Sequence, residues 1–200
     1  MNSLITKTLM KYKIGFYLIL FLLACSLTLL NYIYTKYGAN KIFNEQHDIK
    51  ITNSLSFSQK HNGTPFPVNL IYNVLNTDTI QSHFSKKSVI VLLSNSGCNP
   101  CQIRELKLMD SLFSNYRGKA NFLAIYDGIN NTEPLLLRKV SKAKFSFYRT
   151  LGSAYSDYVG SKTYPVIFLV ENQTVIFNYL PISNNEKFSK WSIKLLSKLL

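Results

Sequence analysis

The chain is poor in the residues that usually bind metal ions in proteins. It contains three cysteines and three histidines, and His47, His61 and His83 show no metal-ligand spacing. A structural zinc site needs four ligands, so the pair Cys98 and Cys101 would have to be completed from distant parts of the chain. We therefore expect no metal and no other cofactor, and we expect the histidines to lie at the surface.

Acidic residues are also scarce. Ten aspartates and glutamates stand against 23 lysines and arginines, which gives a formal net charge of +13. The basic residues are spread along the chain without a dense run or a recognised base-reading module, which argues against nucleic-acid binding. We interpret the charge as a solvated basic surface that permits adhesion to anionic lipid or acidic partners.

Charge is absent altogether from residues 14–34, an apolar run of about the length that crosses a bilayer as a helix. Lys7, Lys11 and Lys13 precede the run and tyrosines crowd its far end, which is typical of a membrane anchor with a cytoplasmic N-terminus. The chain then divides into four predicted segments: 1–13 as the cytoplasmic N-terminus, 14–34 as a transmembrane helix, 35–65 as a linker and 66–200 as the folded domain.

The same apolar run permits a second interpretation. Residues 22–25 read Leu-Leu-Ala-Cys, which resembles a bacterial lipoprotein cleavage site and would make Cys25 a lipidated N-terminus. The run stays apolar beyond Cys25, at Leu27, Leu29 and Ile33, whereas a processed lipoprotein turns polar after its cysteine. We therefore favour the uncleaved anchor, and both interpretations tether the folded domain to a membrane.

The most informative residues are Cys98-Asn99-Pro100-Cys101, which follow an apolar run and precede a helical pattern. Unpaired N–H groups at a helix N-terminus favour a thiolate, so Cys98 is the predicted nucleophile. Cys101, one turn further, is the predicted resolving residue, which attacks a mixed disulfide on Cys98. Pro100 suits the first helical turn and Asn99 is available to tune the reduction potential; both are candidate substrate contacts. A static disulfide or half of a zinc site remain as alternatives.

Strand and helix patterns alternate along the predicted domain. Five consecutive apolar residues at 89–93 indicate a central strand buried on both faces. From that strand the order is β-α-β-α-β-α-β-β-α, an α/β plan with helices covering a central sheet. The predicted elements are strands at 49–51, 66–75, 88–93, 121–126, 145–148, 163–170 and 174–179, helices at 99–116, from 132 and after an Asn184 cap, and a short helix or turn at 152–159.

A dithiol after a buried strand, followed by Tyr164-Pro165 at the start of a hairpin strand and by a final helix, resembles the thioredoxin-like superfamily. The anchor and the C-x-Pro-C motif look most like its extracytoplasmic TlpA/ResA-type branch. The resemblance covers 66–200 and implies a thioredoxin-like α/β fold, with a central mixed sheet flanked by helices. It also implies that Pro165 is cis and lies beside the dithiol, and that Tyr164 presents its backbone to the substrate.

The resemblance implies that the protein is a membrane-tethered thiol-disulfide oxidoreductase. The enzyme would sit in the bacterial inner membrane with its C-terminal domain in the periplasm, and would act on protein disulfides as a reductase, with electrons from a membrane-embedded donor. A peroxiredoxin is disfavoured because the residues before Cys98 lack its characteristic proline. Metal delivery through the dithiol would need a nearby histidine or methionine ligand.

Two positions depart from the family pattern. Gly97 stands where many members have tryptophan, and Leu92 stands where many have a buried aspartate or asparagine that assists the resolving thiol. Glu105 is then the nearest carboxylate in sequence, and we expect it to form a surface salt bridge with Lys107 or Arg104. These departures keep open a second function, a non-catalytic interaction module whose cysteines form a structural disulfide.

Overall fold

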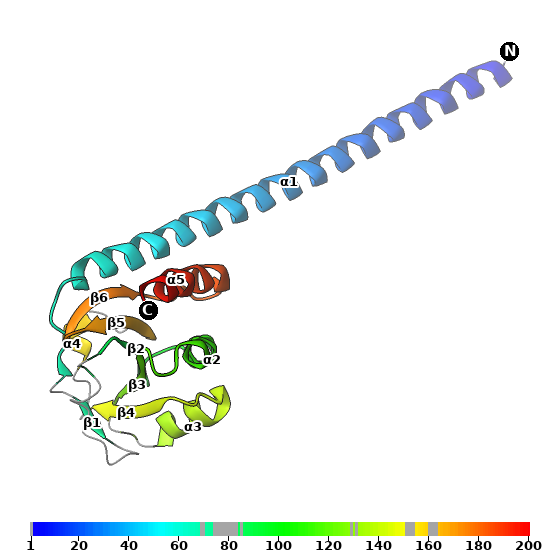
Figure 1. Cartoon of the computed structure of the whole chain (residues 1–200). Coiled ribbons are helices and arrows are strands. Elements are labelled where there is room, and N and C mark those ends of the chain that lie inside the picture. The colour runs from blue at the N-terminus through cyan, green and yellow to red at the C-terminus, as the bar shows by residue number, and fades with distance from the viewer. Residues whose placement is uncertain are drawn as a thin grey trace. The chain divides into compact units, whose positions relative to one another are not determined.

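The computed structural model divides into two compact units, Met1–Ile49 and Lys50–Leu200. It describes residues 2–68, 71–73, 84, 86–128, 130, 132–150, 155–159 and 164–200, without the side chains of 2–20, 37–47 and 72–73. The elements, labelled in Figure 1, are α1 (Asn2–His61), β1 (Ile71–Asn73), β2 (Ser88–Ser94), α2 (Asn99–Tyr116), β3 (Asn121–Asp127), α3 (Thr132–Ser141), β4 (Ser146–Thr150), α4 (Ser156–Val159), β5 (Val166–Glu171), β6 (Thr174–Tyr179) and α5 (Glu186–Leu199).

The first unit consists of helix α1 alone. Its described side chains at 21–36 are all exposed, and they include Phe21, Leu22 and Leu30. The hydroxyls of Ser26 and Thr28 donate to carbonyls one turn earlier in the helix. Among the described residues, no helix holds an apolar stretch long enough to cross a membrane. Residues 14–20 of the predicted span lie outside the described side chains.

Helix α1 continues into the second unit, so the short strand predicted at 49–51 is wrong. Ser54, Phe57 and His61 are buried and recur at helical spacing. Burial of this face overrides the local alternation around Ile49 that suggested a strand. The compact unit accordingly begins at Lys50, within the segment predicted as linker.

His61 corrects the prediction that the histidines lie at the surface. It is 2% exposed, and its Nδ1 and Nε2 each lie 2.9 Å from a carbonyl oxygen, of Phe57 and Tyr158 respectively. The ring also packs against Phe168. His61 therefore joins the end of α1 to α4, while the side chains of His47 and His83 lie outside the described residues.

The second unit is built on a mixed six-stranded sheet in the order β1-β4-β3-β2-β5-β6. β2 pairs parallel to β3, and β3 to β4, because helices α2 and α3 cross between them. β5 pairs antiparallel with both β2 and β6. The predicted order of elements from β2 onward is thus confirmed, as is the mixed sheet.

Two apolar layers hold the helices to the sheet. Alternate residues of β2, such as Val91 and Leu93, face α2, α3 and α5, while Ile90 and Leu92 face the end of α1 and α4. β2 is buried along its whole length, as its apolar composition predicts. The sheet therefore has helices on both faces, and β2 delivers the dithiol loop at its carboxyl end (Figure 1).

Element boundaries differ from the predictions in small ways. α2 spans the predicted range, but the cap of α5 is Asn185, whose Oδ1 accepts from the N–H of Phe188 at 3.0 Å. The predicted cap, Asn184, instead has a positive φ of 61° in the preceding turn. Of the strand predicted at 66–75, residues 71–73 are confirmed, whereas 66–68 form no strand and that part of the prediction is wrong. Residues 69–70 and 74–75 lie outside the described residues.

Candidate active site

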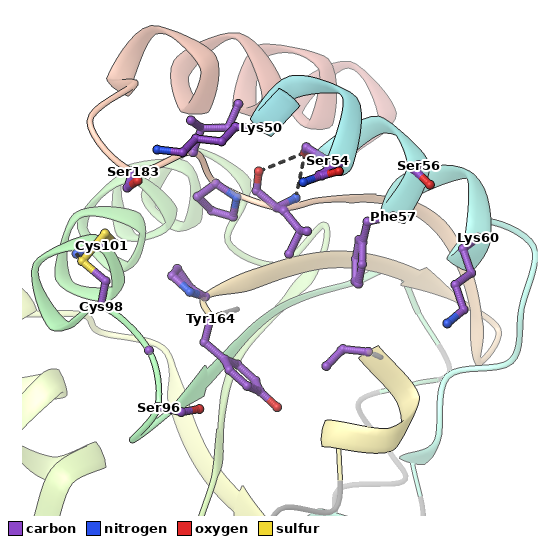
Figure 2. Close-up of a pocket in the computed structure, with 17 residues that line it drawn as sticks. Lys50, Ser54, Ser56, Phe57, Lys60, Ser96, Cys98, Cys101, Tyr164 and Ser183 are labelled. Carbon is purple, nitrogen blue, oxygen red and sulfur yellow. Dashed lines mark hydrogen bonds between the residues drawn. A yellow bond between two sulfur atoms is a disulfide. The ribbon is translucent and has the colours of Figure 1, made fainter. Parts of the chain in front are cut away.

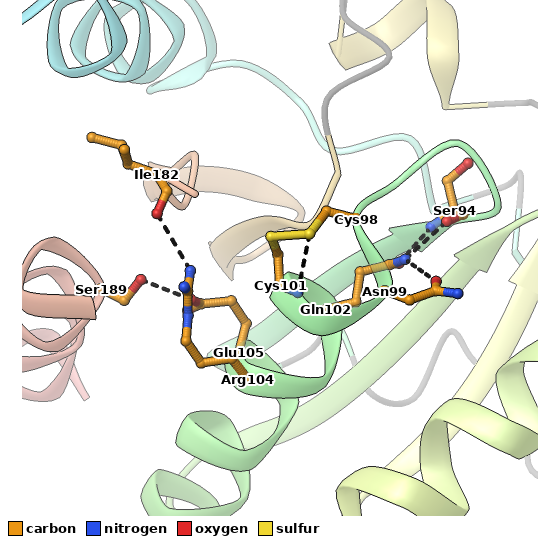
Figure 3. Close-up of a disulfide and its surroundings, with 9 residues drawn as sticks. All are labelled: Ser94, Cys98, Asn99, Cys101, Gln102, Arg104, Glu105, Ile182 and Ser189. Atoms are coloured by element: carbon orange, nitrogen blue, oxygen red, sulfur yellow. Dashed lines mark hydrogen bonds and ion pairs between the residues drawn. A yellow bond between two sulfur atoms is a disulfide. The ribbon is translucent and has the colours of Figure 1, made fainter. Parts of the chain in front are cut away.

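The two cysteines of the motif form a disulfide at the N-terminus of α2. Cys98 is the N-cap residue, and its Sγ accepts from the N–H of Cys101 at 3.4 Å (Figure 3). Cys98 is exposed, whereas Cys101 is 9% exposed. The arrangement suits an outer sulfur that meets a partner and an inner sulfur reached only through the first.

Gln102 fixes the loop that carries Cys98. Its buried amide accepts from the N–H of Ser94 at 2.9 Å and donates to the carbonyl of the same residue at 3.0 Å. The amide also donates to Oδ1 of Asn99 at 3.2 Å. These bonds tie the first turn of α2 to the end of β2, so the dithiol is held from both sides. Sequence reasoning missed Gln102, because a glutamine in a helix gives no signal that it is buried.

Gly97 is closely packed against the residue that precedes the cis proline. A Cβ built at position 97 would lie 2.9 Å from Cβ of Tyr164 and 2.9 Å from Nε2 of Gln102. Real Cβ atoms do not tolerate such contacts, so a side chain at position 97 would displace its neighbours. Gly97, which stands where many proteins of the resembled family have tryptophan, therefore leaves no room for a larger side chain.

The peptide bond between Tyr164 and Pro165 is cis, as the resemblance implies. Tyr164 is 5% exposed and its hydroxyl donates to Oδ2 of Asp127 at 2.8 Å. Burial, and then this bond to the carboxylate, raise the pKa of Tyr164, so the phenol stays neutral. Asp127 also accepts from the hydroxyl of Thr150 and the N–H of Tyr155. The Tyr164 side chain therefore belongs to a buried hydrogen-bond network.

Leu92 confirms the departure noted in the sequence. It is fully buried on β2, paired with Ile125 and Val166, and belongs to the apolar layer under α1 and α4. The position at which the resemblance implies a buried proton acceptor is therefore apolar here. A carboxylate at 92 would be desolvated among hydrocarbon side chains.

Glu105 is not at the surface, which corrects its predicted place. It is fully buried, and it accepts from the hydroxyl of Ser189 at 2.7 Å (Figure 3). It also accepts from the hydroxyl of Tyr179 at 3.1 Å. Arg104, one of the two predicted partners, forms the salt bridge at 3.0 Å. Burial and the Glu105 charge raise the pKa of Tyr179. Glu105 thus connects the dithiol helix to β6 and α5.

A cleft of about 710 Å³ opens beside the dithiol (Figure 2). Its walls come from five segments of the second unit: the end of α1, the dithiol loop, the end of α4, the cis-proline loop and the turn between β6 and α5. Both cysteines, Tyr164 and Pro165 line it, so the structure brings these predicted site residues together. The α1 wall was missed, because the sequence placed that segment in a linker. The lining residues are Lys50, Asn53, Ser54, Ser56, Phe57, Lys60, Ser96, Gly97, Cys98, Cys101, Val159, Tyr164, Pro165, Leu180, Pro181, Ile182 and Ser183.

The remaining predicted site residues lie elsewhere. Asn99 and Pro100 are exposed on the first turn of α2 and do not line the cleft. Cys25 is exposed on α1 and unpaired, and its lipidation stays a prediction. Among the described residues, no cluster of three or more histidine, cysteine, aspartate or glutamate side chains could hold a metal ion.

No protein-family model and no curated protein matches the sequence. Solved structures do match. A protein from Chlorobium tepidum described as the thiol:disulfide interchange protein DsbE has a TM-score of 0.52 at 13% identity, over 68% of this chain and 96% of the other. An uncharacterized thioredoxin-like protein from Porphyromonas gingivalis has a TM-score of 0.50 at 16% identity, over 68% of this chain and 94% of the other. The second unit of this chain therefore has the thioredoxin-like fold that the dithiol and the Tyr164-Pro165 step led us to expect.

Proposed function

We propose that this protein is a thiol-disulfide oxidoreductase that reduces disulfides in partner proteins through Cys98 and Cys101. One observation carries the proposal: an exposed Cys98 caps α2, is bonded to a buried Cys101, and opens onto a cleft also lined by Pro165. The thioredoxin-like fold supports it, and so does the description of the Chlorobium protein as a thiol:disulfide interchange protein.

The reaction follows from the exposure of the two sulfurs. In the reduced protein, the Cys98 thiolate attacks one sulfur of a partner disulfide, and the other partner sulfur leaves as a thiolate that takes a proton from water. The Cys101 thiolate then attacks Sγ of Cys98 and expels the second partner thiol. The partner gains two electrons, and the protein ends as the disulfide described above, which a dithiol donor must reduce.

We further propose that the domain is tethered to the bacterial inner membrane and works in the periplasm, with its electron donor in the membrane. The uncharged run at 14–34 and the lysines before it support this placement. The described part of the run carries exposed apolar side chains, and the hydroxyls of Ser26 and Thr28 are satisfied within the helix. Fractionation of cells that produce the full-length chain, with protease added from the periplasmic side, tests both the tether and its orientation.

The catalytic proposal is tested with single cysteine variants of the full-length chain. Cys98→Ser should abolish reduction of a peptide disulfide, whereas Cys101→Ser should accumulate a mixed disulfide with the peptide, because nothing resolves it. Cys25→Ser is the matched control and should turn over as the wild type does, since Cys25 is unpaired and outside the dithiol motif. Wild-type turnover by Cys98→Ser would refute the mechanism.

The second candidate function, an interaction module with a static disulfide, is favoured by the apolar environment of Leu92. A titration of the Cys98–Cys101 pair against dithiothreitol or glutathione separates the two. A potential near about −270 mV is expected of a reductase, and one near about −120 mV would make the protein an oxidant. A pair that equilibrates with neither buffer would support the static module instead.

A further inference from the structure

The described charged side chains that line the cleft are all positive. Its lining contains two ammonium groups, Lys50 and Lys60, and no acidic residue among the described side chains. The carboxylate behind the cis-proline loop, Asp127, is 2% exposed and accepts three hydrogen bonds within the protein. The carboxylate of Glu105 is likewise buried and bonded. A bound group therefore meets positive charge from the cleft wall without a compensating negative charge.

Both lysines belong to the wall formed by the end of α1. Lys50 and Lys60 lie ten positions apart on the helix, which corresponds to about 15 Å along its axis. Figure 2 shows this part of α1 passing along the cleft, with Lys50 drawn on the side of the dithiol and Lys60 on the other side. Both residues are exposed, and within the described part of the chain neither forms an ion pair.

The backbone that carries the lysines is anchored firmly. The Ser54 hydroxyl donates to the carbonyl of Leu180 at 3.0 Å and accepts from its N–H at 3.2 Å. One turn later, the Ser58 hydroxyl donates to the carbonyl of Asn178 at 3.1 Å. These bonds hold α1 along the edge strand β6, so the lysine positions are fixed relative to the dithiol even though their side chains are solvated.

Apart from the two lysines, the lining of the cleft is mixed. Phe57, Val159, Leu180 and Ile182 contribute hydrocarbon surface, and polar groups come from Asn53, Ser54, Ser56, Ser96 and Ser183. The volume of about 710 Å³ lies within the range of sites that enclose a sizeable ligand. An extended peptide advances about 3.3 Å per residue, so about five residues span the distance between the helix positions of the two lysines. A short strand of a protein substrate matches these dimensions.

We propose that the cleft selects protein disulfides whose cysteine lies in an extended, acidic segment, with carboxylates about five residues apart. Resting on the function proposed above, the inference adds the class of substrate. In the encounter the substrate sulfur meets Cys98 and the flanking carboxylates meet the Lys50 and Lys60 ammonium groups. The exchange itself proceeds as described, with two electrons passing from the dithiol to the substrate disulfide.

The test compares substrates that differ only in charge. Three peptides of equal length carry an internal disulfide flanked by glutamate, glutamine or lysine, and glutathione disulfide serves as a small anionic substrate. The rate constant for each is measured with the reduced full-length chain at low and high salt. The cleft variant is Lys50→Gln with Lys60→Gln. The control, Lys139→Gln with Lys194→Gln, removes the same charge from exposed positions on α3 and α5 outside the cleft.

Wild type and control should reduce the glutamate peptide about tenfold faster than the lysine peptide at low salt, with a smaller ratio at high salt. The cleft variant should lower that ratio to about twofold, with a smaller change in the rate for the glutamine peptide than in the rate for the glutamate peptide. Equal ratios in the cleft variant and the control would overturn the inference while leaving the oxidoreductase intact. So would an equal loss for glutathione disulfide and the glutamate peptide, because the cleft would then recognise small anions rather than a segment. Failure to reduce any substrate would instead overturn the proposed function.

Discussion

The two walls of the cleft are held in different ways. In the dithiol wall, the bonds from Gln102 to Ser94 and Asn99 join residues no more than eight positions apart. In the α1 wall, Ser54 and Ser58 bond to residues 126 and 120 positions away. The first wall is built by one strand, one loop and one helix in succession, whereas the second exists only after the whole sheet has formed.

This difference separates chemistry from recognition. The local wall holds the sulfurs, so its integrity should set how fast the dithiol exchanges with any disulfide. The long-range wall carries the lysines, and its integrity should set which disulfide is preferred. Variants that damage one wall and spare the other therefore test whether the exchange rate and the substrate preference are set separately.

The largest effect is expected in the local wall. Gln102→Leu leaves the buried N–H of Ser94 without its partner and removes one of the two donors to the Ser94 carbonyl, the other being the N–H of Gly97. It should lower the free energy of unfolding by about 3 kcal/mol. Exchange with a neutral small disulfide should also slow, because the loop before Cys98 is released. Urea unfolding and stopped-flow rates measure the two effects. The control, Gln59→Leu, replaces an exposed glutamine and should change little. A loss below about 1 kcal/mol would show that the loop is held by other contacts.

A smaller effect is expected in the long-range wall. Ser54→Ala with Ser58→Ala removes the hydroxyls that bond α1 to β6 and should lower the free energy of unfolding by about 2 kcal/mol. The rate with a neutral small disulfide should stay unchanged, while the preference for an acidic peptide weakens. Ser56→Ala is the matched control, since Ser56 lines the same wall and is exposed. A slower reaction with the small disulfide would mean that the two walls are not independent.

The smallest effect concerns Tyr164, behind the local wall. Because burial and Asp127 raise its pKa above the ordinary 10.0, the folded state keeps the phenol protonated while the unfolded chain ionises. The contribution of the Tyr164 phenol to the free energy of unfolding is therefore complete below pH 10. It falls as the pH rises, by about 1 kcal/mol at pH 11.

Tyr164→Phe should make the fall in stability above pH 10 shallower than in the wild type. Urea unfolding at pH 9, 10 and 11 measures the slope, and the comparison of slopes cancels the stability that the variant loses at every pH. An unchanged slope would show that the Tyr164 phenol ionises equally in both states, and the bond to Asp127 would then carry no weight above pH 10.

The features of the fold and the site that depend on neighbouring residues could be predicted from the sequence. The alternation of apolar strands and amphipathic helices predicted the order of elements from β2 to α5, and the range of α2 was predicted to the residue. The pair Cys98 and Cys101, and the Tyr164-Pro165 step, were found because a few adjacent residues carry their signal. The spacing at which apolar residues recur and the position at which a helix ends are both set by residues a few positions apart in the chain.

The environment of several polar side chains became known only from the tertiary structure. Lys50 and Lys60 looked like part of a polar linker, and Glu105 like a surface residue, since nothing near them in sequence marks their environment. His61 was expected at the surface for the same reason, yet it is buried between Phe57 and Tyr158. Burial of a polar side chain depends on partners supplied by distant segments, so it becomes visible only when the sheet brings those segments together.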